Sequence, residues 1–246
     1  MYDYQAPENL LSGKNILITG AGDGIGRAAA HSYAHLGATV ILLGKTVSKL
    51  EQVYDEIVAK GYSQPAIYPL DLNSATEDDY NKLNQSIMAE FSALHGLLNN
   101  AGILGPRKPL ENITAQQWTE VLQINLTSTF LISKALLPAL KLADNASIIM
   151  TSSGVGRQGR AYWGAYAVSK FGIEGLTQVL AEELENTTNI RVNCINPKAT
   201  NTAMRRTAYP SERPDTNPSS DEIMPLYTYL MGDDSKDING ESIDTR

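Results

Sequence analysis

The sequence predicts a single doubly wound α/β domain, in which a parallel sheet of seven strands carries helices on both faces. Three observations predict this fold class. Short apolar runs rich in β-branched residues alternate with longer stretches of helical period, as in strand–helix–strand units around a buried parallel sheet. This alternation continues along the whole chain without a linker. The chain also has 246 residues, 42% of them apolar, which is enough for one large core.

The strands are expected at seven short apolar runs. These runs span residues 15–19, 39–43, 66–70, 96–99, 147–151, 191–195 and 241–243. Helices are expected between them, where apolar residues recur at helical spacing, over residues 24–36, 47–60, 75–91, 114–140, 162–185 and 221–231. We therefore expect one domain over residues 1–246, in which each helix connects two parallel strands.

Residues 199–220 are the one long segment without a clear period. They contain Pro210, Pro214 and Pro218 among many Ser, Thr and Asn residues. A loop of this length inside a compact domain is usually a lid or a binding loop. We expect this segment to form a substrate lid.

Composition and charge exclude several classes of protein. The 20 basic residues against 27 acidic ones give a net charge of −7, which argues against nucleic acid as a partner. No apolar run approaches the ~18 residues of a membrane span, so no membrane partner is expected. The single cysteine, Cys194, cannot form an internal disulfide, which fits a reducing cytoplasm. His31, His35 and His95 lack the spacing of a metal site, so no metal is expected.

A glycine-rich turn directly follows the first expected strand. Residues 19–26 read TGAGDGIG and lead into the first helix. Glycine allows positive φ and lets the backbone approach a diphosphate, which the free N–H groups of a helix N-terminus attract. A tight connection without a ligand is the alternative. The position of the turn favours a dinucleotide site, with contacts expected from Gly20, Gly22, Asp23, Gly24, Ile25 and Gly26.

The end of the second expected strand, residues 43–46, reads LGKT. In dinucleotide sites a carboxylate at this place binds the ribose 2′-hydroxyl of NAD, whereas a cation binds the 2′-phosphate of NADP. Because Lys45 is cationic and no carboxylate is present there, NADPH is expected to be preferred over NADH. The alternative is that Lys45 is a solvated loop cation. The negative charge of Asp23 also opposes a phosphate nearby.

Tyr166 and Lys170 stand four residues apart in the fifth expected helix, which places both side chains on one face. A neighbouring ammonium stabilises a phenolate, so the pKa of Tyr166 is expected to lie below its usual value of ~10. Such a tyrosine can give a proton to a carbonyl or take one from an alcohol. Tyr-x-x-x-Lys alone is often a coincidence on a helix face. Ser153, after the fifth strand at the edge where ligands bind, makes a catalytic set the better interpretation.

These motifs resemble those of the short-chain dehydrogenase/reductase family in its Tyr-x-x-x-Lys form, and the resemblance covers nearly the whole chain. The matching features, in the family's order, are the turn at 19–26, Asp71, the run Asn99-Asn100-Ala101-Gly102, Asn125, Ser153, Tyr166 and Lys170. Residues 151–160, 163–166 and 231–235 are similar to those of the bacterial YciK-like group of oxidoreductases. The resemblance implies a Rossmann-type fold and an NAD(P)(H)-dependent oxidoreductase.

The resemblance also implies a role for each matching position. Ser153 would hydrogen-bond the substrate oxygen, and Tyr166 would transfer the proton. Lys170 would hold the nicotinamide ribose and tune Tyr166, while Asn125 would keep a water in the proton relay. The other expected cofactor contacts are Asp71 at the adenine, Leu72, Asn99 on the adenosine side, Ala101, Gly102, Pro197 and Thr202.

One position departs from the family's pattern. Where the family commonly has glycine after the proline, this chain has Lys198 after Pro197. Glycine there lets the backbone approach the nicotinamide. Lys198 therefore either crowds that half of the site or points to solvent.

The expected activity is hydride transfer between NADPH and a small carbonyl or alcohol substrate, with 3-oxoacyl thioesters as one class. The alternative is a dinucleotide-binding regulator or scaffold with little turnover. The resemblance implies a homodimer or homotetramer assembled through the two long helices. Several arginines near the serine and in the lid would attract an anionic substrate, unless they are solvated: Arg157, Arg160, Arg205, Arg206 and Arg213.

Overall fold

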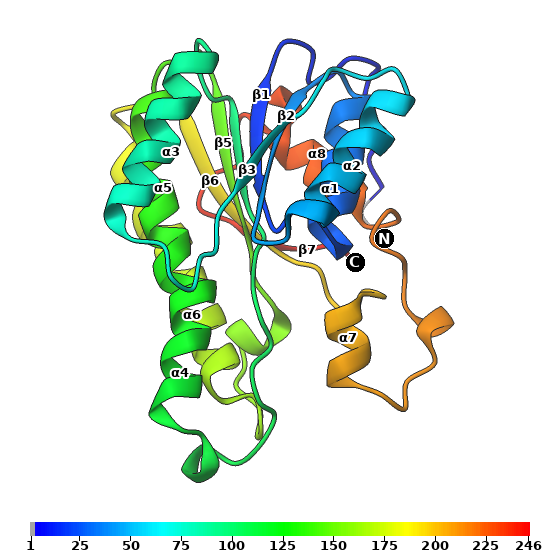
Figure 1. Cartoon of the computed structure of the whole chain (residues 1–246), viewed down its shortest axis with the longest axis vertical. Helices are drawn as coiled ribbons and strands as arrows, with labels where there is room; N and C mark the ends of the chain where they lie inside the picture. The colour runs from blue at the N-terminus through cyan, green and yellow to red at the C-terminus, as the bar shows by residue number, and fades with distance from the viewer. Residues whose placement is uncertain (1–2) are drawn as a thin grey trace.

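Seven parallel strands form the sheet at the centre of the computed structural model (Figure 1), which describes residues 3–246 apart from the side chain of Pro214. The strands pair in the order β3-β2-β1-β4-β5-β6-β7. Their bounds are β1 (Asn15–Thr19), β2 (Thr39–Gly44), β3 (Ala66–Pro69), β4 (Gly96–Asn99), β5 (Ala146–Thr151), β6 (Ile190–Asn196) and β7 (Ser242–Asp244). The order reverses between β1 and β4, the position where open parallel sheets bind ligands. The predicted fold class is confirmed.

Helices cover both faces of the sheet. They are α1 (Gly24–His35), α2 (Val47–Ala59), α3 (Glu77–Glu90), α4 (Ala115–Leu122), α5 (Ser128–Leu140), α6 (Gly164–Glu185), α7 (Ala203–Ala208) and α8 (Met224–Met231). In Figure 1, α1, α2 and α8 lie on one side of the sheet, and α3 and α5 lie on the other, with α4 and α7 below. Within residues 3–246, no helix is long and apolar enough to cross a membrane.

Successive residues of β1 point to opposite faces of the sheet and belong to different parts of the core. Ile16 and Ile18 pack with residues of α1, α2 and α8, whereas Leu17 packs with residues of α3, α5 and α6. All three side chains are fully buried. A strand covered on both faces needs apolar residues at every position. This is why β1 reads as a continuous apolar run rather than as an alternation.

Two segments differ from the sequence-based prediction. The single helix expected over residues 114–140 contains one π-helical turn, Gln123–Thr127, between α4 and α5. Residues 199–220, expected to be irregular, include α7, which has only six residues. Thr202 caps α7, because its Oγ1 accepts a hydrogen bond from the Arg205 N–H at 3.1 Å. Neither feature is long enough to show a period of its own in the sequence.

Cys194 lies in β6 and is fully buried. Its Sγ lies 3.3 Å from Oε2 of Glu174 and 3.1 Å from Oγ of Ser242. Burial raises the pKa of the thiol to about 12. A thiol in such surroundings is structural and unreactive.

Candidate active site

A pocket of about 490 Å³ opens at the carboxyl ends of the strands and joins the glycine turn to the catalytic candidates. The predicted site residues in its wall are Gly20, Gly22, Asp23, Gly24, Ile25, Lys45, Asp71, Leu72, Ala101, Gly102, Ser153, Tyr166, Lys170, Pro197 and Thr202. Gly26, Asn99 and Asn125 are buried outside this lining. The structure therefore brings most of the predicted residues into one pocket, although they come from every part of the chain.

The glycine turn after β1 fits a dinucleotide, because it leaves no room for side chains. Gly20 and Gly24 have φ angles of 67° and 51°, a conformation that favours glycine. A Cβ on Gly26 would lie 2.2 Å from the carbonyl oxygen of Gly20, and one on Gly20 would lie 3.1 Å from Cα of Ala101. The turn leads into α1, whose N-terminal N–H groups attract anions. The backbone can therefore approach a diphosphate closely here.

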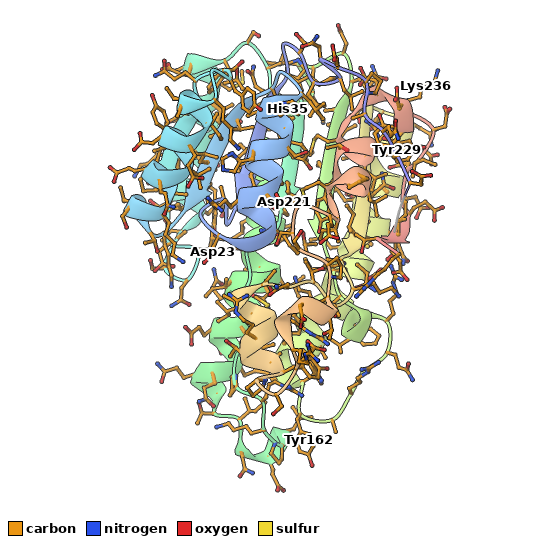
Figure 2. The ribbon with its side chains drawn as sticks, turned by 90° about the vertical axis from the view of Figure 1, so that its right-hand side faces the viewer. Asp23, His35, Tyr162, Asp221, Tyr229 and Lys236 are labelled. Atoms are coloured by element: carbon orange, nitrogen blue, oxygen red, sulfur yellow. The ribbon has the colours of Figure 1, made fainter. Side chains whose placement is uncertain are left out.

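Asp23 lies at the start of α1, at its lower end in Figure 2, and its charge is balanced within the protein. Its Oδ1 accepts a hydrogen bond from the Gly24 N–H at 2.7 Å, and its Oδ2 accepts one from Lys49 Nζ at 2.6 Å. The Lys49 ammonium lowers the pKa of Asp23. Lys45 and Lys49 both line the pocket, and Lys45 forms no ion pair with another described residue. Lys49 was not among the predicted contacts, although it stands four residues after Lys45, one helical turn further along the chain.

The loop after β4 is fixed against the glycine turn by Thr19. The Oγ1 of Thr19 accepts hydrogen bonds from the N–H groups of Asn100 and Ala101 at 2.9 and 3.0 Å. Asn99, expected on the adenosine side, is buried and donates instead to Oγ of Ser133 in α5 at 3.0 Å. Its neighbour Asn100 lines the pocket. Adjacent residues at a strand end point to opposite faces, which is why the pocket position belongs to Asn100.

Ser153, Tyr166 and Lys170 meet beside the carboxyl end of β5. The Nζ of Lys170 donates to the carbonyl oxygen of Thr151 at 2.7 Å and lies 5.7 Å from the centre of the Tyr166 ring. Ser153 and Tyr166 line the same pocket, and Ser153 is close enough to favour a lower pKa of Tyr166. Both hydroxyls can therefore reach one substrate oxygen, the geometry that proton transfer to a carbonyl requires.

Burial dominates the protonation of this pair, contrary to the expectation from the sequence. Tyr166 is 8% exposed and Lys170 is 4% exposed. Burial raises the pKa of Tyr166 to about 12, although Ser153 acts in the opposite direction. Burial also lowers the pKa of Lys170 to about 8. The expectation of a lowered Tyr166 pKa is therefore wrong, because desolvation outweighs the attraction of the ammonium.

Asn125 lies in the π-helical turn between α4 and α5 and is 1% exposed. Its Oδ1 accepts from the Ile103 N–H at 2.8 Å, and its Nδ2 donates to the Ile103 carbonyl at 2.9 Å. Nδ2 also lies 3.1 Å from Oγ of Ser169 in α6. The side chain thus connects the loop after β4 to α6. Its expected role in holding a water stays a prediction.

Lys198 adopts a backbone conformation that glycine favours. Its φ angle is 55°, which is uncommon for a residue with a side chain. Its N–H donates to Oδ1 of Asn196 at 3.1 Å, and its Nζ forms an ion pair with Asp244 in β7. The side chain is 37% exposed and also contacts the pocket. Lys198 is therefore held by β7 rather than free in solvent.

The fold and the site together define a class of protein. A parallel sheet, a glycine turn where the strand order reverses, and a serine, tyrosine and lysine set at the same edge are features of Rossmann-type oxidoreductases. Within residues 3–246, no group of His, Cys, Asp and Glu side chains is arranged to hold a metal ion.

Comparison with known proteins identifies the family. The sequence model of the short chain dehydrogenase family matches residues 14–213, so the chain belongs to the short-chain dehydrogenase/reductase family of oxidoreductases. It is 48% identical to the oxidoreductase YciK of Escherichia coli K12 over 243 residues, which cover 99% of this chain and 96% of that protein. The predicted family is confirmed.

Two solved structures resemble this one closely. A short chain dehydrogenase from Pseudomonas syringae superposes with a TM-score of 0.98 at 51% identity, covering 100% of both chains. A short chain dehydrogenase from E. coli CFT073, complexed with NADPH, gives a TM-score of 0.94 at 49% identity, covering 98% of this chain and 100% of that one. NADPH is thus bound by a relative of the same fold.

Proposed function

We propose that the protein reduces a ketone or aldehyde to an alcohol with NADPH, and catalyses the reverse oxidation. The observation that carries this proposal is the shared pocket, in which Ser153, Tyr166 and Lys170 lie with the glycine turn. A site that only bound a dinucleotide would need the turn but not the buried tyrosine and lysine. The alternative of a regulator or scaffold with little turnover leaves this pair unexplained. Among carbonyl compounds, 3-oxoacyl thioesters are a class that the family resemblance implies.

The protonation states indicate how the residues act. The pKa of about 12 keeps Tyr166 protonated at neutral pH, so its hydroxyl donates a proton to the substrate oxygen during reduction. Ser153 donates a second hydrogen bond to that oxygen and orients it. Lys170 holds the nicotinamide ribose hydroxyls, and Asn125 keeps a water near Lys170. Bound NADPH supplies the hydride.

The proposed cofactor is NADPH, in preference to NADH. Lys45 and Lys49 line the pocket, and Lys49 neutralises Asp23, which removes the main objection to a 2′-phosphate. The NADPH complex of the relative supports the same choice. Catalytic efficiency is therefore expected to be higher with NADPH, and a ratio of the NADPH to the NADH value near or below one would contradict the preference.

Residues 199–220 form the proposed substrate lid. The helix α7 contributes Met204, Arg205 and Ala208 to the pocket wall. Arg107, in the loop after β4, donates to the carbonyl oxygen of Ala208, and its guanidinium lies 4.5 Å from the centre of the Trp163 ring. These contacts join α7 to the loops after β4 and β5. Opening of the lid would have to break them.

Replacement of Tyr166 by phenylalanine tests the proposed chemistry. NADPH oxidation with a panel of ketones, diketones and acyl thioesters is expected to fall by about a hundredfold or more, because the general acid is lost. NADPH affinity, measured by fluorescence titration, should change little. Tyr162→Phe is the matched control, since Tyr162 is 56% exposed and lies at the far tip of the protein (Figure 2).

Two outcomes would contradict the proposal. Undiminished turnover by Tyr166→Phe would remove the assigned proton donor. A wild-type protein that binds NADPH but reduces no compound of the panel would favour the regulator or scaffold.

A further inference from the structure

A second pocket, of about 290 Å³, adjoins the main pocket at Ser153. We call it the cationic pocket; its wall includes Ser153, Arg160, Trp163, Lys198, Arg205 and Tyr209. Ser153, Trp163, Lys198 and Arg205 also line the main pocket. Because the catalytic serine belongs to both walls, a substrate held at Ser153 can extend into the cationic pocket.

The cationic pocket takes its positive charge from three separate segments. Arg160 belongs to the loop after β5, Lys198 to the turn after β6 and Arg205 to α7. In the part of the chain that the structure describes, no aspartate or glutamate side chain lines this pocket. Its wall therefore attracts anions.

Two of these cations are held in place by carboxylates outside the pocket lining. Lys198 pairs with Asp244, and the Nε and Nη2 of Arg205 donate to Glu212 at 2.7 and 2.6 Å. Ammonium and guanidinium groups carry more donors than these pairs use. Arg160 has no ion-pair partner among residues 3–246. The charge of Arg160, which is exposed, is therefore not paired within this part of the protein.

Aromatic rings give the cationic pocket fixed walls. The Arg107 guanidinium lies 4.5 Å from the centre of the Trp163 ring and 5.1 Å from that of Tyr209. The Arg205 guanidinium lies 3.8 Å from the centre of the Tyr209 ring. Such cation–π contacts hold the rings against both arginines. A pocket that is already ordered loses less free energy when a ligand binds.

We propose that the cationic pocket binds a carboxylate or phosphate group of the carbonyl substrate. This inference rests on the proposed function. The carbonyl oxygen of the substrate would lie at Ser153 and Tyr166, and its anionic group would bind Arg160 and Arg205. Guanidinium groups bind the oxygens of either anion in pairs. The reaction transfers a hydride from NADPH and a proton from Tyr166, converts C=O to CH–OH, releases NADP⁺ and leaves the anionic group unchanged. The preferred substrates are oxo acids or phosphorylated ketones.

Matched pairs of substrates test this inference by kcat/KM for NADPH oxidation. Levulinate is compared with its methyl ester, and dihydroxyacetone phosphate with dihydroxyacetone. In the wild-type protein, kcat/KM is expected to be about tenfold or more higher for the anionic member of at least one pair, as a charge-assisted hydrogen bond allows. The pair that responds distinguishes a carboxylate from a phosphate.

Variants of Arg160 provide the second comparison. Arg160→Gln is expected to lower kcat/KM for the preferred anion about tenfold and to leave the value for its neutral partner unchanged. Arg160→Lys should restore part of the loss, because it restores the charge. Arg213→Gln is the matched control, since Arg213 belongs to the same proposed lid as Arg205 but is 80% exposed and lies outside the pocket wall.

A binding measurement separates this inference from the proposed function. Calorimetric titration of the NADP⁺-saturated protein with levulinate and with dihydroxyacetone phosphate is expected to show binding that Arg160→Gln weakens, whether or not turnover occurs. Binding without any turnover would overturn the proposed function alone. Binding of neither anion would overturn the cationic pocket, as would equal kcat/KM values within both pairs or an Arg160→Gln variant that affects both members alike.

Discussion

At the scale of single residues, burial controls the chemistry of the site. Tyr166 and Lys170 are nearly inaccessible, and each therefore favours its neutral form. A neutral Tyr166 is a proton donor, which suits carbonyl reduction. Lys170, whose pKa is lowered to about 8, changes charge within the range of ordinary enzyme assays. The two directions of the reaction should consequently respond to pH in opposite ways.

Carbonyl reduction is expected to decline as the pH rises through about 8, because Lys170 loses the proton that makes it a cation. Alcohol oxidation needs Tyr166 to accept a proton, so its rate is expected to increase with pH toward the Tyr166 pKa of about 12. Initial rates of NADPH oxidation and of NADP⁺ reduction across this range measure both trends. Reduction that accelerates above pH 8 would show that Lys170 acts in its neutral form.

That most of the candidate residues gather in one pocket could be predicted from the sequence, but their protonation and orientation could not. The four-residue spacing of Tyr166 and Lys170 fixes one helix face. The depth of that face below the surface depends on how the neighbouring loops pack. For the same reason, the sequence did not distinguish Asn99, which points to Ser133, from Asn100, which lines the pocket.

At the scale of elements, the π-helical turn Gln123–Thr127 places Asn125 between two other parts of the site. The turn adds a residue to the helical path, and such insertions often occur at functional sites. The Asn125 side chain then satisfies both backbone groups of Ile103. The stability of the loop after β4 should therefore depend on this side chain in addition to the Thr19 and Arg107 contacts.

Asn125→Ala is expected to lower the free energy of unfolding by about 1–2 kcal/mol, because it removes two hydrogen bonds between a buried side chain and the part-buried backbone groups of Ile103. Urea denaturation followed by circular dichroism measures the change. Asn112→Ala, at an exposed position before α4, should change the same quantity by no more than about 0.5 kcal/mol. Equal effects of the two substitutions would mean that the Ile103 contacts add nothing to stability.

Helices and strands were predicted well from the sequence where a long run of apolar residues marks them. The bounds of β1 and β4 agree with the expected 15–19 and 96–99, since a strand buried on both faces is a continuous apolar run. The π-helical turn has no such signal, because the residues around it keep an apolar pattern that a plain α-helix also fits. The irregular segment 199–220, the proposed lid, was predicted from its proline content, but α7 within it was not.

At the scale of the whole molecule, α5 and α6 lie on the same side of the sheet (Figure 1). Both helices expose large apolar side chains. Phe130 of α5 is 46% exposed, and Val168, Phe171 and Val179 of α6 are 45%, 45% and 55% exposed. Apolar side chains gathered on neighbouring helices are typical of surfaces that associate. We propose that these helices form the contact of a homodimer or homotetramer, as the family resemblance implies.

Phe171→Glu should weaken this association, because it places a charge within an apolar contact. Light scattering coupled to size-exclusion chromatography is expected to show an oligomer for the wild type and a smaller species for the variant. Val58→Glu is the control, because Val58 is 44% exposed but belongs to α2 on the opposite face of the sheet. A monomeric wild type, or an equal loss of mass in both variants, would contradict the assigned contact.

Topology could be predicted from the sequence because every connection between consecutive strands contains a helix, which leaves few arrangements of the sheet. Surfaces made by several segments could not be predicted in this way. The cationic pocket combines side chains from the loop after β5, the turn after β6 and α7. These side chains lie close together because the connections fold back over the strand ends. No local sequence pattern predicts that folding.

The burial of Cys194 has a practical consequence for fluorescence experiments. The chain has a single thiol, and that thiol is fully buried with a pKa of about 12, so maleimide dyes should leave the native protein unlabelled. A cysteine introduced at Thr207, an exposed position of α7, would then carry the sole fluorophore. Its emission would report directly whether α7 moves when nucleotide or ketone is added.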